Sequence, residues 1–283
     1  MTMDITTCMC MPNWRIEIIR PPHGGFKSAL FDFDGTVSLL REGWQRVMIP
    51  YFTEVLTEAA PERDPDEVSR TVTDFVDILT GKQTIFQCQR LAEEVLKSGG
   101  KPADPYDYKR EYLRRLTERI AGRLSSLQSG EADPGQFLVP GSREFLEKLK
   151  NRGVKLYLAS GTDEADVLEE ARLLGVDGLF DGGIHGALDT VTDCSKELVI
   201  KRILAENRLR GAELVGFGDG YVEIQLVKEA GGYAVAAATD EERREGVNAW
   251  KRARLLGAGA DAVIPDFSEY EALDRFISGE TGG

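Results

Sequence analysis

The sequence is poor in residues that crosslink a chain or bind soft metals. Its 283 residues include four cysteines, at positions 8, 10, 88 and 194, and two histidines. A chain of this length buries a core without disulfides, and scattered cysteines are typical of a reducing compartment. The Cys8-x-Cys10 pair has no companion cluster of zinc-ligand spacing, which favours a loosely ordered terminus over a metal site. We therefore expect a reduced, cytoplasmic protein.

Positive charge and long apolar runs are also scarce. The chain has 35 Lys and Arg against 48 Asp and Glu, a formal net charge of −13. This balance argues against nucleic acid or an anionic membrane surface as a partner. No apolar run reaches the roughly 18 residues of a membrane span, and no basic segment followed by an apolar stretch opens the sequence. A small anionic substrate is still compatible, because a metal ion and a few lysines reverse the field locally.

The remaining sequence alternates between two patterns. Short apolar runs bounded by turn residues predict buried strands at 28–33, 154–159, 214–217, 233–238 and 262–265. Helical spacing of apolar residues lies between them, at 142–151, 164–174, 195–207 and 222–229. This alternation predicts an α/β fold, a Rossmann-like parallel sheet with helices on both faces. Residues 15–20 alternate like a further strand at an edge.

Residues 39–139 interrupt this alternation. They contain no convincing strand, and four helical patterns cover 44–58, 65–80, 84–96 and 106–127. We interpret this stretch as an all-α helical module inserted after the first strand. The predicted organisation is an N-terminal extension at 1–26, an α/β core at 27–38 and 140–283, and the helical insert at 39–139. We expect hinges at its two junctions, around 38–42 and 134–141, and the prolines and glycines of the second suit a linker between packed units.

Two carboxylates follow the first predicted strand. Asp32 and Asp34 are two residues apart, and Gly35 permits the chain to turn sharply after them. Carboxylates this close repel each other unless a cation or a proton lies between them. The pair therefore indicates a metal site or an acid and base pair, with an acidic turn as the alternative.

Other strand ends carry complementary groups. Ser160-Gly161-Thr162 offers a hydroxyl and backbone N–H groups at the expected start of a helix, where anions bind. Lys196 opens another predicted helix, and Asp219 and Glu223 follow the third strand. Carboxyl ends of parallel strands meet at one edge of the sheet, so these groups are expected together. They would supply oxygen ligands for Mg²⁺ and partners for phosphoryl oxygens.

In these segments the sequence resembles the haloacid dehalogenase superfamily. The resemblance lies in residues 31–36, 158–162, Lys196 and 215–223, in that order and at similar separations. It implies that the insert is a helical cap, that Asp32 is the nucleophile and that Asp34 is the general acid and base. Ser160, Gly161 and Lys196 would bind the phosphoryl group. The implied Mg²⁺ site comprises Asp32, Asp34, Asp219 and Glu223, with Glu223 standing where Asp is frequent.

The resemblance implies a Mg²⁺-dependent phosphomonoester hydrolase acting on a small phosphorylated metabolite, such as a sugar phosphate. Family members that cleave carbon–halogen or phosphonate bonds lack an acid at the position of Asp34. The alternatives are a phosphosugar mutase using the same Asp pair and, less favoured, a phospholigand-binding protein without turnover.

Substrate specificity is expected from the cap. Arg41 and Lys82 are the candidate specificity residues, because each lies in a polar stretch next to a predicted helix. The basic residues from Lys109 to Arg119 alternate with glutamates, so we interpret them as a solvated helix face. His185 lies in a turn-rich link, where a structural role is favoured.

Overall fold

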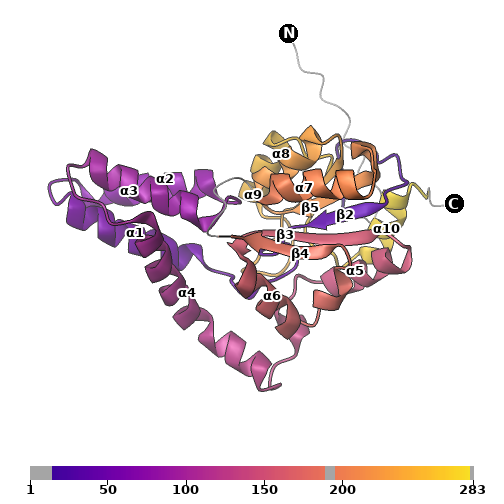
Figure 1. Cartoon of the computed structure of the whole chain (residues 1–283), viewed down its shortest axis with the longest axis horizontal. Helices are drawn as coiled ribbons and strands as arrows, with labels where there is room; N and C mark the ends of the chain where they lie inside the picture. The colour runs from indigo at the N-terminus through magenta and orange to yellow at the C-terminus, as the bar shows by residue number, and fades with distance from the viewer. Residues whose placement is uncertain (1–14, 189–194, 281–283) are drawn as a thin grey trace, which may run out of the picture.

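The structure is a computed structural model and describes residues 15–188 and 195–280. An α/β core and a module of long helices lie side by side (Figure 1). Cys8, Cys10 and Cys194 lie outside the described residues, and Cys88 is buried in the helical module. Within the described residues, no helix has both the length and the apolarity needed to cross a bilayer.

Within the described ranges, seven strands form one sheet in the order β1-β7-β6-β5-β2-β3-β4. They are β1 (Glu17–Ile18), β2 (Ser28–Phe31), β3 (Lys155–Asp163), β4 (Gly183–Ala187), β5 (Leu214–Gly218), β6 (Tyr233–Ala237) and β7 (Ala262–Ile264). Every neighbouring pair is parallel except β1 with β7. The Rossmann-like sheet and its additional edge strand are thereby confirmed. β2 lies centrally, so its carboxyl end adjoins those of β3 and β5.

Helices cover both faces of the sheet (Figure 1). The helices α5 (Ser142–Asn151), α6 (Glu164–Leu173) and α10 (Tyr270–Ser278) pack on one face, and α7 (Ser195–Glu206), α8 (Tyr221–Glu229) and α9 (Ala249–Gly257) on the other. Successive strand residues point to opposite faces, so Phe31 joins the first cluster and Leu30 the second. Because both faces are covered, the inner strands β5, β6 and β7 carry only buried apolar residues and glycine.

A group of aromatic rings supports the carboxyl ends of β2 and β5. Phe31 stacks on Phe217 with 4.6 Å between ring centroids, and Phe145 meets Phe217 edge-on at 5.2 Å. Phe31 immediately precedes Asp32, and Phe217 lies two residues before Asp219. Each such ring pair contributes about 0.5–1.5 kcal/mol beyond its burial. The packing therefore fixes the two acidic strand ends relative to each other.

Two local expectations were wrong. The turn-rich link around His185 contains an edge strand, β4, because its backbone pairs in parallel with β3. β3 also extends beyond Ala159, through Ser160-Gly161-Thr162 to Asp163, after a register irregularity. Helix α6 begins only at Glu164. The Ser160-Gly161-Thr162 segment therefore belongs to a strand end and not to a helix start, since pairing with β4 keeps it extended.

The helical module contains four helices with a core of their own. They are α1 (Gln45–Ala59), α2 (Pro65–Leu79), α3 (Thr84–Lys97) and α4 (Pro105–Gln128), close to the four predicted patterns. Asp64 and Asp104 cap α2 and α4, each followed by a proline at the first helical position. Their buried side chains form a cluster separate from the two beside the sheet. The cap boundaries 39–139, with the core at 27–38 and 140–283 and the extension at 1–26, stay a prediction. Leu39, Leu40, Leu138 and Val139, at the two ends of the cap range, pack in the cluster beside the sheet.

The two connections between core and cap run side by side. Ser38 bridges Leu138, and Val139 N–H donates to the Val37 carbonyl at 3.0 Å. From α4, the Arg123 guanidinium donates to the carbonyls of Leu39 and Leu40 at 3.2 and 2.7 Å. The paired connections place the cap over the carboxyl edge of the sheet.

Candidate active site

The first acidic pair leaves β2 directly at the sheet edge. The Asp32 N–H donates to the Phe217 carbonyl at 2.9 Å, which holds Asp32 beside the end of β5. Asp32 is 7% exposed. Gly35 adopts a positive φ of 76°, and a Cβ there would collide with the Asp219 carboxylate. Glycine is therefore required at this position for two reasons: the positive φ and the lack of space for a Cβ.

Lys196 lies between two of the carboxylates. Its Nζ is 2.9 Å from Asp32 Oδ1 and 2.9 Å from Glu223 Oε2, and its side chain is 4% exposed. Burial raises the pKa of Asp32 well above its ordinary value, against the lowering effect of Lys196. Burial alone would lower the pKa of Lys196, but the two carboxylates raise it, so the ammonium stays charged. Lys196 also lowers the pKa of Glu223, although burial opposes this.

Three carboxylates form a candidate metal site. Oxygen atoms of Asp32, Asp219 and Glu223 all lie within 4.8 Å of one another. Burial raises the pKa of Asp219 to about 6, because desolvation disfavours its charged form. Buried carboxylates this close need further positive charge, and an all-oxygen donor set suits Mg²⁺. The residues present therefore fit the implied cation.

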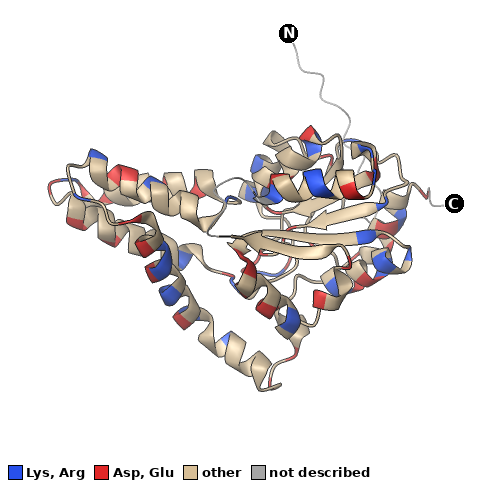
Figure 2. Cartoon of the chain, in the orientation of Figure 1, with Lys and Arg blue, Asp and Glu red and all other residues tan. Residues whose placement is uncertain are grey.

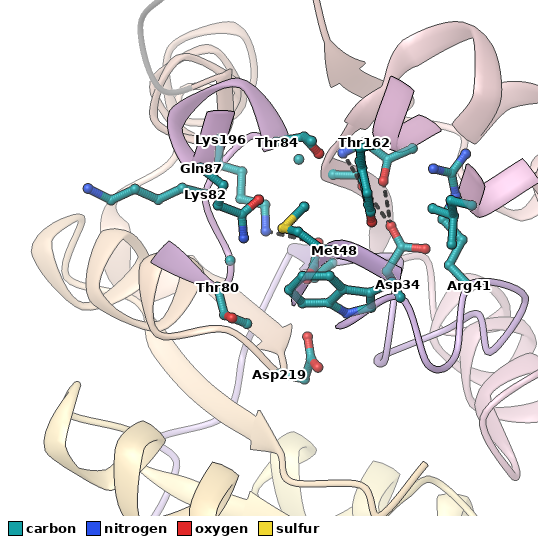
Figure 3. Close-up of a pocket in the computed structure, with 17 residues that line it drawn as sticks. Asp34, Arg41, Met48, Thr80, Lys82, Thr84, Gln87, Thr162, Lys196 and Asp219 are labelled. Atoms are coloured by element: carbon teal, nitrogen blue, oxygen red, sulfur yellow. Dashed lines mark hydrogen bonds and ion pairs between the residues drawn. The ribbon is translucent and has the colours of Figure 1, made fainter. Parts of the chain in front are cut away.

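Asp34 lies apart from this cluster. Its Oδ2 accepts from Thr162 Oγ1 at 2.8 Å and from Ser160 Oγ at 3.4 Å (Figure 3). Its Oδ1 is buried and has no hydrogen-bond partner among the described residues. Ser160 Oγ accepts from the Thr162 N–H at 3.0 Å, which orients the hydroxyl. A place for the Asp34 side chain among the metal ligands stays a prediction.

Sequence reasoning missed two charged residues at the site. Lys251, from α9, lies 2.6 Å from Asp219 Oδ2 and 2.5 Å from Glu241 Oε1. Burial alone would lower the pKa of Lys251, but Asp219 and Glu241 raise it. Lys251 therefore adds a second positive charge beside the acidic cluster. Glu241 follows β6, and the rule that parallel strands end at one edge would have found it. No motif in the sequence marks Lys251.

The cap reaches the site through the loop between α2 and α3. A Cβ on Gly220 would lie 3.0 Å from Gly81 Cα, and a Cβ on Gly161 would lie 3.0 Å from the Lys82 carbonyl oxygen. The backbone of the cap loop therefore contacts the backbones of two core loops at glycines, where any side chain would keep them apart. From α9, Arg254 donates to the carbonyls of Asp77, Ile78 and Thr80 at the end of α2. These contacts hold the loop over the carboxylates.

Core and cap together enclose a cavity. Its empty volume is about 640 Å³, including the open solvent at its mouth. Core residues line the end near β2, and cap residues line the other (Figure 3). The predicted site residues on its wall are Asp32, Asp34, Ser160, Gly161, Lys196, Asp219, Arg41 and Lys82. Glu223 lies behind them, paired with Lys196.

The two candidate specificity residues differ in their surroundings. Arg41 is buried and pairs with Glu170 and Asp166 of α6, at 2.7 and 2.9 Å, so its guanidinium is held by the core. Lys82 is exposed, and its Nζ lies 6.0 Å from the centroid of the Phe86 ring. Roles for Arg41 and Lys82 in substrate selection stay predictions.

The basic residues of α4 fall into two groups, exposed and buried. Lys and Arg are interspersed with Asp and Glu along this helix (Figure 2). Arg110 and Arg114 are exposed and pair within the helix, as expected of a solvated face. Lys109 is buried and pairs with Asp163 at 2.7 Å. The expectation was wrong for Lys109, because it lies where α4 meets the core.

Comparison with known proteins places this geometry in a family. A model of the haloacid dehalogenase-like hydrolase family matches residues 26–231, which include both acidic strand ends and Lys196. The chain belongs to this family. The resemblance noted in the sequence is thereby confirmed.

One curated relative matches a shorter part of the chain than the family model does. A phosphoserine phosphatase from Streptococcus thermophilus is 30% identical over 102 residues, which span 32% of this chain and 46% of that protein. The chain thus spans about half the length of this curated relative.

Three solved structures share the fold. A predicted phosphoglycolate phosphatase from Haemophilus somnus is 18% identical, covering 89% of this chain and 99% of its own, with a TM-score of 0.56. A beta-phosphoglucomutase from Clostridium difficile is 14% identical, covering 90% and 98%, with a TM-score of 0.60. CbbY from Rhodobacter sphaeroides, solved with xylulose-(1,5)bisphosphate, is 21% identical, covering 86% and 96%, with a TM-score of 0.55.

Proposed function

We propose that the protein is a Mg²⁺-dependent phosphomonoester hydrolase that acts on a small phosphorylated metabolite through an aspartyl-phosphate intermediate. The observation that carries this proposal is the position of Asp32. It is a buried carboxylate at the end of a cavity, 2.9 Å from the Lys196 ammonium and within the cluster formed with Asp219 and Glu223. A carboxylate so placed is suited to attack phosphorus, because the Lys196 ammonium and a cation held by the neighbouring carboxylates would offset the charge of the incoming phosphoryl group.

In the first step, an oxygen of Asp32 forms a bond to phosphorus and the bond from phosphorus to the ester oxygen breaks. Asp34 delivers a proton to the departing alkoxide. Its unpartnered Oδ1 supports this role, since that atom has no competing hydrogen bond within the described chain. Thr162 and Ser160 hold the other oxygen, Oδ2, and so fix the carboxyl group.

In the second step, water attacks the phosphorus of the acyl phosphate. Asp34 takes a proton from that water, and the bond between phosphorus and Asp32 breaks to release inorganic phosphate. Lys196 and the Ser160 hydroxyl stabilise the phosphoryl oxygens throughout. Because the Thr80–Gln83 loop of the cap contacts the core loops, bulk water is excluded while the first bond forms.

Asp32, Asp219 and Glu223 would hold the cation, with Asp34 the further ligand predicted from the family resemblance. A bound Mg²⁺ supplies positive charge that lets an anionic nucleophile approach an anionic phosphate. Lys251 and Glu241 position Asp219 through the contacts at 2.6 and 2.5 Å.

The test is release of phosphate from a panel of phosphomonoesters with Mg²⁺. We expect turnover that disappears with EDTA and is inhibited by Ca²⁺, whose larger and looser shell spoils the alignment. Asp32→Asn should abolish it without unfolding the protein, and more than a tenth of the wild-type rate would refute the nucleophile. The same panel identifies a mutase, which would convert one ester of a sugar phosphate into another with little free phosphate.

A further inference from the structure

The cap end of the cavity has an apolar wall. Trp44 and Met48 contribute from the α1 side, and Tyr112 and Leu116 contribute from α4. Met48, Tyr112 and Leu116 are buried, and burial raises the pKa of Tyr112, so its ring carries no charge near neutral pH. An alcohol that leaves phosphorus with a proton from Asp34 therefore meets indole, thioether, phenol and hydrocarbon surface.

The charge facing this wall is already balanced. Of the three cations that line the cavity, Lys196 is held at the phosphoryl end by Asp32 and Glu223. Arg41 uses Nε and Nη2 for Glu170 and Asp166. Burial raises the pKa of Glu170 to about 7, although Arg41 opposes this. Whether Glu170 is protonated or not, Arg41 and its partners carry no net positive charge.

Lys82 is the remaining cation, and it lies at the rim. The side chain is exposed and extends toward Phe86 rather than into the cavity. Figure 3 shows it running away from Asp34 and Asp219. In this arrangement Lys82 does not compensate a charge placed beside the apolar wall.

We propose, on the basis of the function proposed above, that the substrate is the monophosphate of an uncharged alcohol that lays an apolar or aromatic face against Trp44, Met48, Tyr112 and Leu116. A second phosphate or a carboxylate on that alcohol would be desolvated without a compensating cation. The printed names of the relatives include phosphoserine and phosphoglycolate, whose alcohols do carry a carboxylate. The inference thus separates this chain from those activities.

Polar groups at the same end suit hydroxyls. Thr80, Thr84 and Gln87 line the cavity beside the apolar wall. Arg41 also lines it, and its Nη1 makes no polar contact with another residue of the described chain. A guanidinium whose charge is compensated still donates hydrogen bonds to a neutral oxygen. One or two hydroxyl or carbonyl oxygens on the alcohol therefore fit.

Paired substrates test the inference directly. The first pair is 4-carbamoylphenyl and 4-carboxyphenyl phosphate, and the second is glycerol 3-phosphate and 3-phosphoglycerate. Within each pair the shape is nearly constant and the second charge changes. We expect kcat/KM for the uncharged member to be higher by about 10- to 100-fold, the range for a charged group buried without a partner.

Two variants of α6 with the same change of charge provide the internal control. Asp166→Asn removes a half-exposed partner of Arg41, so Arg41 and its partners become one charge unit more positive and the preference within each pair should shrink at least about fivefold. Glu169→Gln changes an exposed residue of the same helix and should leave the preference unchanged. Circular dichroism confirms that both variants are folded.

The outcomes separate this inference from the proposed function. Equal or better turnover of the carboxylate members overturns the inference alone, and loss of such turnover in Lys82→Met would identify Lys82 as the missing cation. Identical preferences in Asp166→Asn and Glu169→Gln also overturn it, because Arg41 would then not set the charge of the cavity. No phosphate release from any ester overturns the proposed function and this inference together.

Discussion

Lys196→Met is the most informative perturbation of the candidate site. The substitution keeps most of the length of the side chain and removes an ammonium that lies 2.9 Å from both Asp32 and Glu223. Asp219 belongs to the same group of carboxylates, so two buried acids and one partly buried acid are left close together. Removing one partner of a buried ion pair costs about 3–5 kcal/mol. We expect a loss of this size in the free energy of unfolding of the metal-free protein.

Mg²⁺ should recover part of the loss. A cation bound to the native state stabilises it by mass action, about 2.7 kcal/mol at 100 times its dissociation constant. Without the competing ammonium the carboxylates should bind Mg²⁺ more tightly, and a tenfold gain in affinity returns about 1.4 kcal/mol. Catalysis should still fall by about 10²- to 10³-fold, because Lys196 is also expected to stabilise phosphoryl oxygens.

Urea denaturation with EDTA and with excess Mg²⁺ measures both effects. Lys201→Met is the matched control on α7, since Lys201 is exposed and solvent screens its pair with Glu197. The reasoning would be refuted by a metal-free Lys196→Met protein as stable as Lys201→Met. That result would mean that the carboxylates do not depend on the ammonium for charge balance.

Three further predictions concern cap closure and the buried pair beside the cavity. Arg254→Met should raise KM for p-nitrophenyl phosphate severalfold with little change in kcat, because three carbonyls at the end of α2 lose their hydrogen-bond donor. An unchanged KM on every ester would contradict this. Gly161→Ala should lower kcat/KM by about tenfold or more, since its Cβ would press on the Lys82 carbonyl, and equal activity would show that the cap closes differently. Burial raises the pKa of Glu170 from 4.5 to about 7, so between these pH values the native state binds one proton more than the unfolded state. The free energy of unfolding should therefore fall by about 3 kcal/mol as pH rises from 4.5 through 7. Glu170→Gln should flatten that part of the profile in chemical denaturation, and an identical slope would place the titration elsewhere.

The sequence predicted the elements that carry a strong periodic signal. The four cap helices have apolar residues at helical spacing, α2 and α4 also have aspartate caps, and the observed bounds differ from the prediction by few residues. Asp32 and Asp219 were predictable as neighbours because both follow apolar strands of one parallel sheet. Strand β4 was missed, because glycines and one histidine make it resemble a turn until β3 is present to pair with it. Tertiary pairing decided that segment, and local propensity did not.

Side-chain partners across the fold were the least predictable part of the site. Lys251 reaches Asp219 from a helix that begins 30 residues later, and Arg41 meets α6 more than 120 residues later. Such contacts depend on how helices pack on the sheet, and a surface lysine and a buried one look alike in sequence. Lys109 shows the same limit, since the next basic residue on α4, Arg110, is exposed while Lys109 is buried against Asp163.

The glycines at the junction of cap and core connect these observations. Gly81 lies against Gly220, and Gly161 lies against the Lys82 backbone, so the cap loop approaches both core loops without an intervening side chain. That approach brings the apolar wall from α1 and α4 over the carboxylates and leaves the Lys82 side chain outside. Closure therefore adds hydrophobic surface to the cavity while adding little charge, which is the arrangement expected where the core supplies recognition of the phosphate and the cap supplies recognition of an uncharged alcohol.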